Sequence, residues 1–199
     1  MKKAFLLLLF ISSLHYSHGQ IKEVSLIFKT NLAKLHYEFA TPQVGFEIGT
    51  NLKFPLRKKF DLVTGGSFRF VRYGISKKST PDVLNHSEQL FHFKVPIELS
   101  YRITPDRWRT HLGVWSSLLL AGDANADSDF ISLVENNERT FFSTAYFGAN
   151  VGFSHSFPKG FEILIDYSYS FNNIYQKGIR RAGLDIFSLG ILIPIKKQQ

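Results

Sequence analysis

The segment Thr140–Phe171 reads TFFSTAYFGANVGFSHSFPKGFEILIDYSYSF, and its alternation of apolar and polar residues decides the predicted fold. Successive side chains of a β-strand point to opposite faces, so each arm around Pro158-Lys159-Gly160 gathers its apolar residues on one face. In the first arm this apolar series runs from Phe141 to Phe157, and in the second from Phe161 to Phe171. Both arms reach the roughly 9–11 residues that a tilted strand needs to cross a membrane. The segment therefore predicts a hairpin of two membrane-spanning strands.

The opposite face of the first arm indicates which side of the sheet meets lipid. It carries Gly148, Asn150, Gly152 and small hydroxyl side chains, and no long charged residue. Small polar residues suit a crowded, hydrogen-bonded interior better than open water. The all-apolar face, with aromatic residues near both ends, suits lipid and its two interfaces. We therefore predict a barrel with an apolar wall and a polar interior.

The N-terminal residues predict export. Met1-Lys2-Lys3 is a short positive region, and an apolar run from Ala4 to Leu14 follows. Ser17 and Gly19 are small residues three and one before Gln20, as a signal peptidase requires. The apolar run is far shorter than the roughly 20 residues of a membrane anchor. We expect residues 1–19 to be a cleaved signal peptide and residues 20–199 to be one domain. Cleavage removes two lysines and no acid, so the formal net charge of the chain falls from +8 to +6.

Composition narrows the class further. The chain has no Cys, which removes a disulfide framework and a thiolate metal site, and it has 20 Phe and 8 Tyr. No later segment is a continuous transmembrane helix, so a membrane protein of this sequence must be a closed barrel, because lipid offers no partner to an open sheet edge. The net charge is positive, but the sequence shows no basic stripe interleaved with aromatic residues that could stack on bases. We therefore expect no nucleic-acid partner.

The same alternation recurs along the chain and predicts eight strands, an all-β, antiparallel, up-and-down transmembrane β-barrel. Besides the two hairpin arms, the strands expected are Val24–Tyr37, Val44–Leu56, Phe60–Tyr73, Phe91–Ile103, Arg109–Ala121 and Leu184–Ile195. The connections are then 38–42, 57–59, 76–89, 104–107, 122–139, 158–160 and 173–183. Every second one is a tight turn and the others are mostly long, as in a bacterial outer-membrane barrel with both termini in the periplasm.

At this point the chain resembles a known family. The stretch Phe93–Tyr101, FKVPIELSY, looks like the "IPL…Y" strand of the PorT-like outer-membrane β-barrel family. The stretch Asp166–Ile174, DYSYSFNNI, followed by a strand ending Leu189-Gly190-Ile191, is similar to the closing pair of that family. The resemblance implies an outer-membrane barrel. The chain departs from many such barrels in lacking a terminal aromatic residue, because Lys196-Lys197-Gln198-Gln199 follows Ile195.

An eight-stranded barrel has an interior that side chains fill, so no open pore is expected. Charged residues on the inward parity have both signs, and buried charges must pair to be tolerated. We expect a structural network of ion pairs rather than a polar conduit, with Arg69, Glu98 and Asp166 as members. The inward candidates include Lys29, Glu47, Lys53, Arg69, Lys94, Glu98, Arg102, Glu162 and Asp166.

Some small barrels are lipid A deacylases or acyltransferases, so catalysis has to be considered. A hydrolase needs a nucleophile, a base and an acid within hydrogen-bond reach. His155 falls on the lipid side and Asp166 on the inner side, while His92 and His111 point inward towards opposite ends. The segment Tyr169–Asn172 lacks the histidine of the deacylase His-x-Ser-Asn motif. We expect no enzyme activity, no catalytic residue and no cofactor.

The remaining candidates lie in the outer loops. Asp123–Asp129 spaces oxygen side chains like half a calcium loop, but Ser128 stands where the glycine belongs, so no metal site is expected. Lys177, Arg180 and Arg181 could contact phosphates of outer-leaflet lipid, or they could be ordinary exposed basic residues. Expected partners are outer-membrane lipid, lipopolysaccharide and other outer-membrane proteins, the last through a patch such as Phe141, Phe147 and Phe153. A soluble lipocalin-like barrel that binds an apolar ligand is the main alternative, and a lipid-modifying barrel enzyme is the second.

Overall fold

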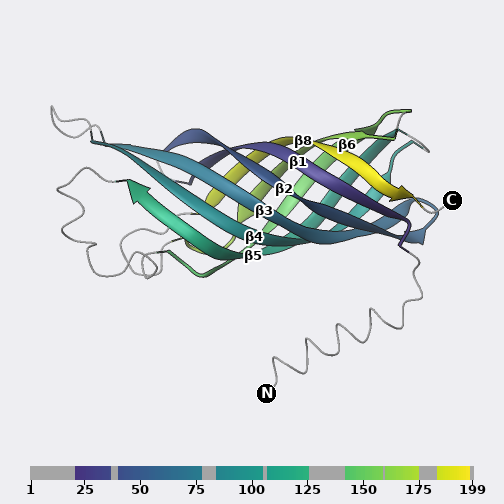
Figure 1. The fold of residues 1–199 in the computed structure, drawn as a ribbon, viewed down its shortest axis with the longest axis horizontal. Helices are drawn as coiled ribbons and strands as arrows, with labels where there is room; N and C mark the ends of the chain where they lie inside the picture. Colours follow the sequence, from purple (N-terminus) through teal and green to yellow (C-terminus); the bar gives the residue numbers. More distant parts are fainter. Residues whose placement is uncertain are drawn as a thin grey trace, which may run out of the picture.

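The computed structural model describes residues 21–36, 40–77, 84–104, 107–125, 142–158, 160–174 and 183–197. These residues form a closed barrel in which each strand pairs antiparallel with its neighbours in sequence and β1 closes on β8 (Figure 1). No helix long and apolar enough to cross a membrane occurs in these ranges. The strands are β1 (Glu23–Leu35), β2 (Ala40–Arg57), β3 (Phe60–Lys77), β4 (Leu84–Arg102), β5 (Trp108–Asn125), β6 (Ala145–Ser156), β7 (Glu162–Ser170) and β8 (Leu184–Lys197). The predicted fold class is confirmed.

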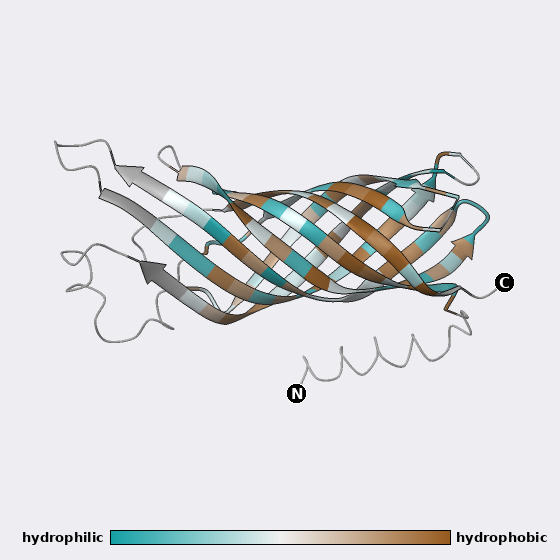
Figure 2. Cartoon of the chain, turned by 45° about the horizontal axis from the view of Figure 1, so that its top comes forward, coloured by the Kyte–Doolittle hydropathy of each residue, from teal (hydrophilic) through white to brown (hydrophobic). Residues whose placement is uncertain are grey.

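The predicted faces are also confirmed. On the hairpin β6–β7, Phe153 and Ile165 lie exposed on the outer wall, whereas Asn150 and Asp166 are buried inside. The same division holds on the other strands, whose outer wall carries many large apolar side chains. Figure 2 shows hydrophobic and hydrophilic residues alternating along the strands. Apolar side chains exposed in such number would be unfavourable in water, but they suit the hydrocarbon of a bilayer.

Several strand bounds differ from the prediction. β3 continues to Lys77 and β4 begins at Leu84, with Gly74 opposite Ser87, so the predicted connection 76–89 is too long. β2 likewise begins at Ala40 and β5 continues to Asn125. Alternation of apolar residues marks only the part of a strand that meets lipid. Beyond that part the backbone hydrogen bonds between strands continue with polar residues. The side-chain pattern therefore does not predict where the strand ends.

The first hairpin arm is shorter than predicted. Regular pairing of β6 begins at Ala145 instead of Thr140. At this start of β6, on its β7 side, the Asn172 side chain takes the place of a ladder partner: its Oδ1 accepts from the Phe147 amide at 2.8 Å, and its Nδ2 donates to the Ala145 carbonyl at 2.6 Å. Thr140 and Phe141 lie outside the described residues.

The two ends of the barrel differ. At one end, here called the turn end, β2–β3, β4–β5 and β6–β7 are joined by short connections, with Gly160 at φ +92° in the last. Glu23 pairs with Lys197 at this end, so the first strand begins and the last strand ends there (Figure 1). The other connections meet at the opposite, loop end. Turns alternate with loops as predicted.

Candidate functional site

The middle of the lumen holds a layer of charged side chains from five strands. Glu47 on β2 is its most heavily bonded acid: Arg69 on β3 donates from Nε to Oε2 at 2.6 Å and Ser67 donates from Oγ to Oε1 at 2.8 Å. Lys94 on β4 places its Nζ 3.6 Å from Oε1 of the same carboxylate. All four side chains are almost completely buried. Two cations thus share one acid.

The same layer contains a second pair and a bridging acid. Lys29 on β1 donates from Nζ to Asp166 Oδ2 on β7 at 2.5 Å, which joins strands that do not pair with each other. Glu98 on β4 accepts from Asn150 Nδ2 at 2.8 Å. Together the layer has three acids and three bases, so its formal charge is zero: Glu47, Glu98, Asp166, Lys29, Arg69 and Lys94.

A second layer lies towards the turn end. Lys53 lies between Glu23 and Glu162, at 3.0 and 3.2 Å from their Oε1 atoms, and Arg109 also pairs with Glu162. Arg102 holds Asp61 with two hydrogen bonds, from Nη2 at 2.9 Å and from Nε at 3.1 Å. Buried charges are costly unless paired in good geometry, and these groups meet that condition.

The three residues singled out in the sequence, Arg69, Glu98 and Asp166, all lie in the middle layer. They do not contact one another: Arg69 binds Glu47, Asp166 binds Lys29 and Glu98 binds Asn150. Among the charged members of the two layers, the inward candidates named from the sequence omit Glu23, Asp61 and Arg109, which are the first or second residues of β1, β3 and β5. Their inward parity could have been counted from neighbouring strand residues.

The loop-end half of the lumen is filled by apolar and aromatic side chains, which the sequence analysis did not predict. Tyr73 and Tyr146 are its largest fully buried side chains, and Tyr73 Oη donates to Glu88 Oε2 at 2.5 Å. Two side chains outside the strands complete this loop-end seal, Phe142 and Ile174, whose backbones join where the Ser143 amide donates to the Ile174 carbonyl at 2.6 Å. The other members are Ala33, Leu35, Ala40, Val71, Leu90, Trp115, Leu184 and Ile186. A signal existed on β1, β3 and β4; for example, Tyr73 shares the inward parity of the charged Arg69 on β3.

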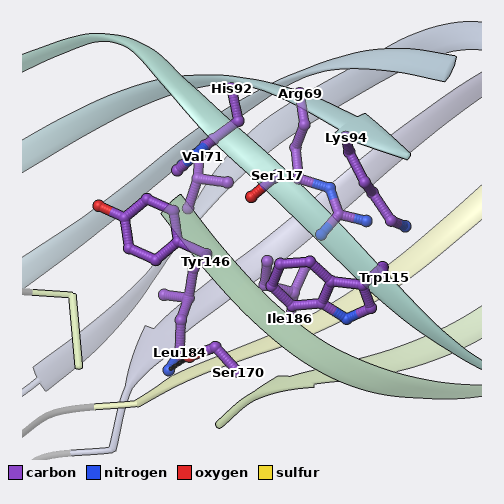
Figure 3. A pocket seen from close by; sticks show the side chains of 10 residues that line it. All are labelled: Arg69, Val71, His92, Lys94, Trp115, Ser117, Tyr146, Ser170, Leu184 and Ile186. Atoms are coloured by element: carbon purple, nitrogen blue, oxygen red, sulfur yellow. Dashed lines mark hydrogen bonds between the residues drawn. The ribbon is translucent and has the colours of Figure 1, made fainter. Parts of the chain in front are cut away.

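A small cavity lies between the middle layer and the seal (Figure 3). Arg69, His92 and Tyr146 line it, and its volume is about 10 Å³. Ligand pockets measure roughly 300–1,000 Å³, and a cavity this small has room for about one water molecule. This cavity therefore offers no room for an organic ligand.

One arrangement in the turn-end layer resembles catalytic machinery. His111 Nε2 lies 2.9 Å from Ser154 Oγ, which donates to Glu162 Oε2 at 3.2 Å. In a hydrolytic triad the acid orients the far nitrogen of the histidine, whereas here it binds the serine, and His111 Nδ1 has no hydrogen-bond partner among the described residues. Ser154 is also only 1% exposed. The geometry is that of a buried hydrogen-bond chain.

The histidines considered in the sequence lie as predicted. His155 is on the outer wall, with its ring 4.4 Å from Trp108, and is separated from the inward Asp166. His92 lies opposite Leu119 and His111 opposite Ser100 on the β4–β5 ladder, so the two are far apart along the barrel. Ser170 accepts the Leu184 amide at 2.7 Å, a structural role.

No group of three potential metal-ligating side chains occurs in the part of the chain that the structure describes. Most of the acidic segment considered for calcium, and the basic residues Lys177, Arg180 and Arg181, lie outside it.

A closed barrel with an apolar wall and a charge-balanced interior defines a membrane-spanning β-barrel. Residues 21–176 match the family described as outer membrane protein beta-barrel domain, and the chain belongs to this family. A comparison with curated proteins gives no match.

Solved structures resemble this barrel with low sequence identity. Neisserial surface protein A is 14% identical, with a TM-score of 0.52 over 85% of this chain and 96% of that chain. Ail, the attachment invasion locus protein of Yersinia pestis, is 14% identical, with a TM-score of 0.49 over 87% and 98%. OprG from Pseudomonas aeruginosa is 12% identical, with a TM-score of 0.43 over 88% and 95%. At this identity, the first likeness supports the fold and nothing more.

Proposed function

We propose that the protein is a non-catalytic barrel of the bacterial outer membrane that acts as a structural or interaction component. The observation that carries this proposal is the filled lumen: two ion-paired layers towards the turn end and an apolar seal towards the loop end. A transport pathway would need a continuous hydrated channel, and an enzyme would need an accessible nucleophile. In this proposal the packed lumen is a rigid support for the outer wall and the loops, and Arg69, Glu98 and Asp166 have structural roles in it.

The alternative of a soluble lipocalin-like barrel does not fit the wall. A lipocalin keeps its apolar faces inside and presents charged ones to water, whereas here Leu112 is 65% exposed and Lys94 1%. Its ligand cavity would also have to lie where charged and aromatic side chains fill the lumen. A lipid-modifying enzyme is disfavoured because Ser154 has no access to a substrate.

The same proposal includes the orientation of the barrel in the membrane and its membership of the PorT-like family. The short connections at the turn end support a periplasmic location for that end and for both chain termini, after cleavage of residues 1–19. The stretches that resemble the PorT-like family fall on β4 and on β7 with the residues after it. This supports membership of that narrower group.

The outer wall and loops are the proposed contact surfaces. Lipid and lipopolysaccharide would cover most of the apolar wall. Phe147 and Phe153, each 55% exposed on β6, are candidates for packing against another outer-membrane protein. Phe141, the third residue of the expected patch, lies outside the described residues.

Planar-bilayer recordings test the sealed lumen. The reconstituted barrel should give no unitary current steps, while a wide porin in the same bilayer provides the positive control. An assay of acyl-chain release from lipid A tests the catalytic alternative. Steady current steps would contradict a sealed lumen, and acyl release that Ser154→Ala abolishes would contradict a non-catalytic role.

A further inference from the structure

Four exposed cations gather at the turn end. Arg57 is the last residue of β2, Lys58 and Lys59 form the β2–β3 connection, and Arg107 lies in the β4–β5 connection. None of the four forms an ion pair with a described residue; Lys59 instead holds its Nζ 6.0 Å from the centre of the Tyr101 ring. We call these four residues the basic rim.

The acids at this end do not compensate the basic rim. Glu23, Asp61 and Glu162 are buried in the lumen, and each already binds a lysine or arginine there. No exposed Asp or Glu lies at the turn end among the described residues. Among the described residues, the outward-facing charge at the turn end is therefore positive and open to an external anion.

Aromatic rings mark the depth of the basic rim. Phe60 packs on Tyr101 with ring centres 5.0 Å apart, and Phe157 stacks on Phe161 at 4.5 Å. Trp108, half exposed, lies beside His155 next to these rings on the β5–β6 wall. Aromatic residues of barrels gather at the boundary between hydrocarbon and headgroups. The cations that lie just beyond this belt therefore stand at the level of the headgroups.

We propose that the basic rim binds the phosphate groups of anionic phospholipids in the leaflet that surrounds the turn end. Lipid is favoured over an acidic protein because the connections are short and keep the cations at headgroup depth instead of projecting them beyond it. Arginine can grip a phosphate with two parallel hydrogen bonds, and lysine supplies a point charge. This inference rests on the proposed placement of the barrel in a membrane.

Trp108 provides a built-in probe. The chain has two tryptophans, and the other, Trp115, is buried inside the lumen. The folded barrel is reconstituted in phosphatidylcholine vesicles that carry equal fractions of chain-brominated phosphatidylcholine or chain-brominated phosphatidylglycerol. Bromine quenches nearby tryptophan, so the ratio of the two quenching constants reports which lipid is enriched beside Trp108. Trp108→Phe supplies the background from Trp115.

The wild type should show stronger quenching by the anionic lipid. A surface cation changes the local preference for anionic lipid by up to roughly fivefold, so four should give a preference of at least several-fold. The variant Arg57→Gln/Lys58→Gln/Lys59→Gln/Arg107→Gln should bring the ratio close to one. The matched control, Lys34→Gln/Arg72→Gln, removes two exposed cations at the loop end and should leave the ratio unchanged. High salt should lower the preference of the wild type without any mutation.

Two results would overturn the inference: equal quenching by both lipids in the wild type, or an undiminished preference in the rim variant. Absence of quenching by either lipid would show instead that Trp108 is not in a membrane, which contradicts the proposed function itself.

Discussion

Lys29 and Asp166 pair across strand β8, which separates β1 from β7. Gly190 on β8 lies opposite Lys29, and a Cβ at Gly190 would come within 2.5 Å of the lysine Cγ. The missing side chain therefore leaves space for the lysine to reach over the strand. Contacts of this kind depend on the tilt and stagger of the strands, which fix the residues that share a height in the barrel.

The Lys29–Asp166 pair should show strong coupling in a double-mutant cycle. Lys29→Met and Asp166→Leu should each destabilise the barrel by about 3–5 kcal/mol, because each leaves one buried charge without its partner. The double variant should be much closer to wild type. Urea unfolding in lipid vesicles measures all three. Additive losses would show that the pair does not form.

Glu47 should be the least replaceable acid of the middle layer. Glu47→Gln leaves Arg69 and Lys94 without their carboxylate, and we expect a loss of about 3–5 kcal/mol. Asp185→Asn is the matched control, since Asp185 accepts from Tyr167 on the exposed wall at 2.7 Å and should cost no more than about 1 kcal/mol. Similar losses in both variants would contradict the account of the lumen.

At the scale of the strand, alternation predicted which face of each element meets lipid, because every lipid-facing position is selected for the same property. Ile165 and Asp166 illustrate this: one parity count assigned both correctly. The ion-pair partners in the lumen could not be predicted in this way. The alternation tells whether a side chain faces inward, but not how far along the barrel axis it lies. The loop-end seal was missed for a related reason, since an inward Tyr73 and an inward Arg69 obey the same period.

The assigned face of β7 predicts a dependence on depth. Ile165→Arg puts a charge on the lipid face in the middle of a strand and should cost about 2–4 kcal/mol, whereas Ile103→Arg at the turn end should cost about 0–1 kcal/mol. Both isoleucines are similarly exposed. Unfolding in lipid vesicles measures the loss of stability in each variant. A larger loss for Ile103→Arg than for Ile165→Arg would show that the boundary of the lipid is assigned wrongly.

Gly148 on β6 gives a prediction about packing inside the lumen. A Cβ there would lie 2.4 Å from Cζ2 of Trp115 and 2.1 Å from the Tyr169 carbonyl oxygen. Gly148→Ala should destabilise the barrel by about 1–3 kcal/mol through overpacking. Gly66 faces outwards with only the Phe93 ring nearby, at 3.0 Å, so Gly66→Ala is a control that should be tolerated. The melting temperature in detergent compares them, and equal tolerance would mean that Trp115 packs elsewhere.

At the scale of the whole molecule, closure of the sheet and filling of the lumen act together. Closure leaves no sheet edge exposed to lipid, and the neutral middle layer lets charged side chains exist within the span of the bilayer. The loop-end seal blocks the lumen on the other side. What remains available for interaction is the outer wall, the loops and the basic rim.

The most direct test of a stable membrane barrel is gel electrophoresis of the mature protein, extracted from an outer-membrane fraction, with and without boiling. The unboiled protein should keep its compact barrel and migrate faster, boiling should slow its migration, and its circular dichroism spectrum in detergent should be rich in β-structure. A water-soluble monomer recovered without detergent, with migration unaffected by boiling, would contradict the assignment of the apolar wall to lipid.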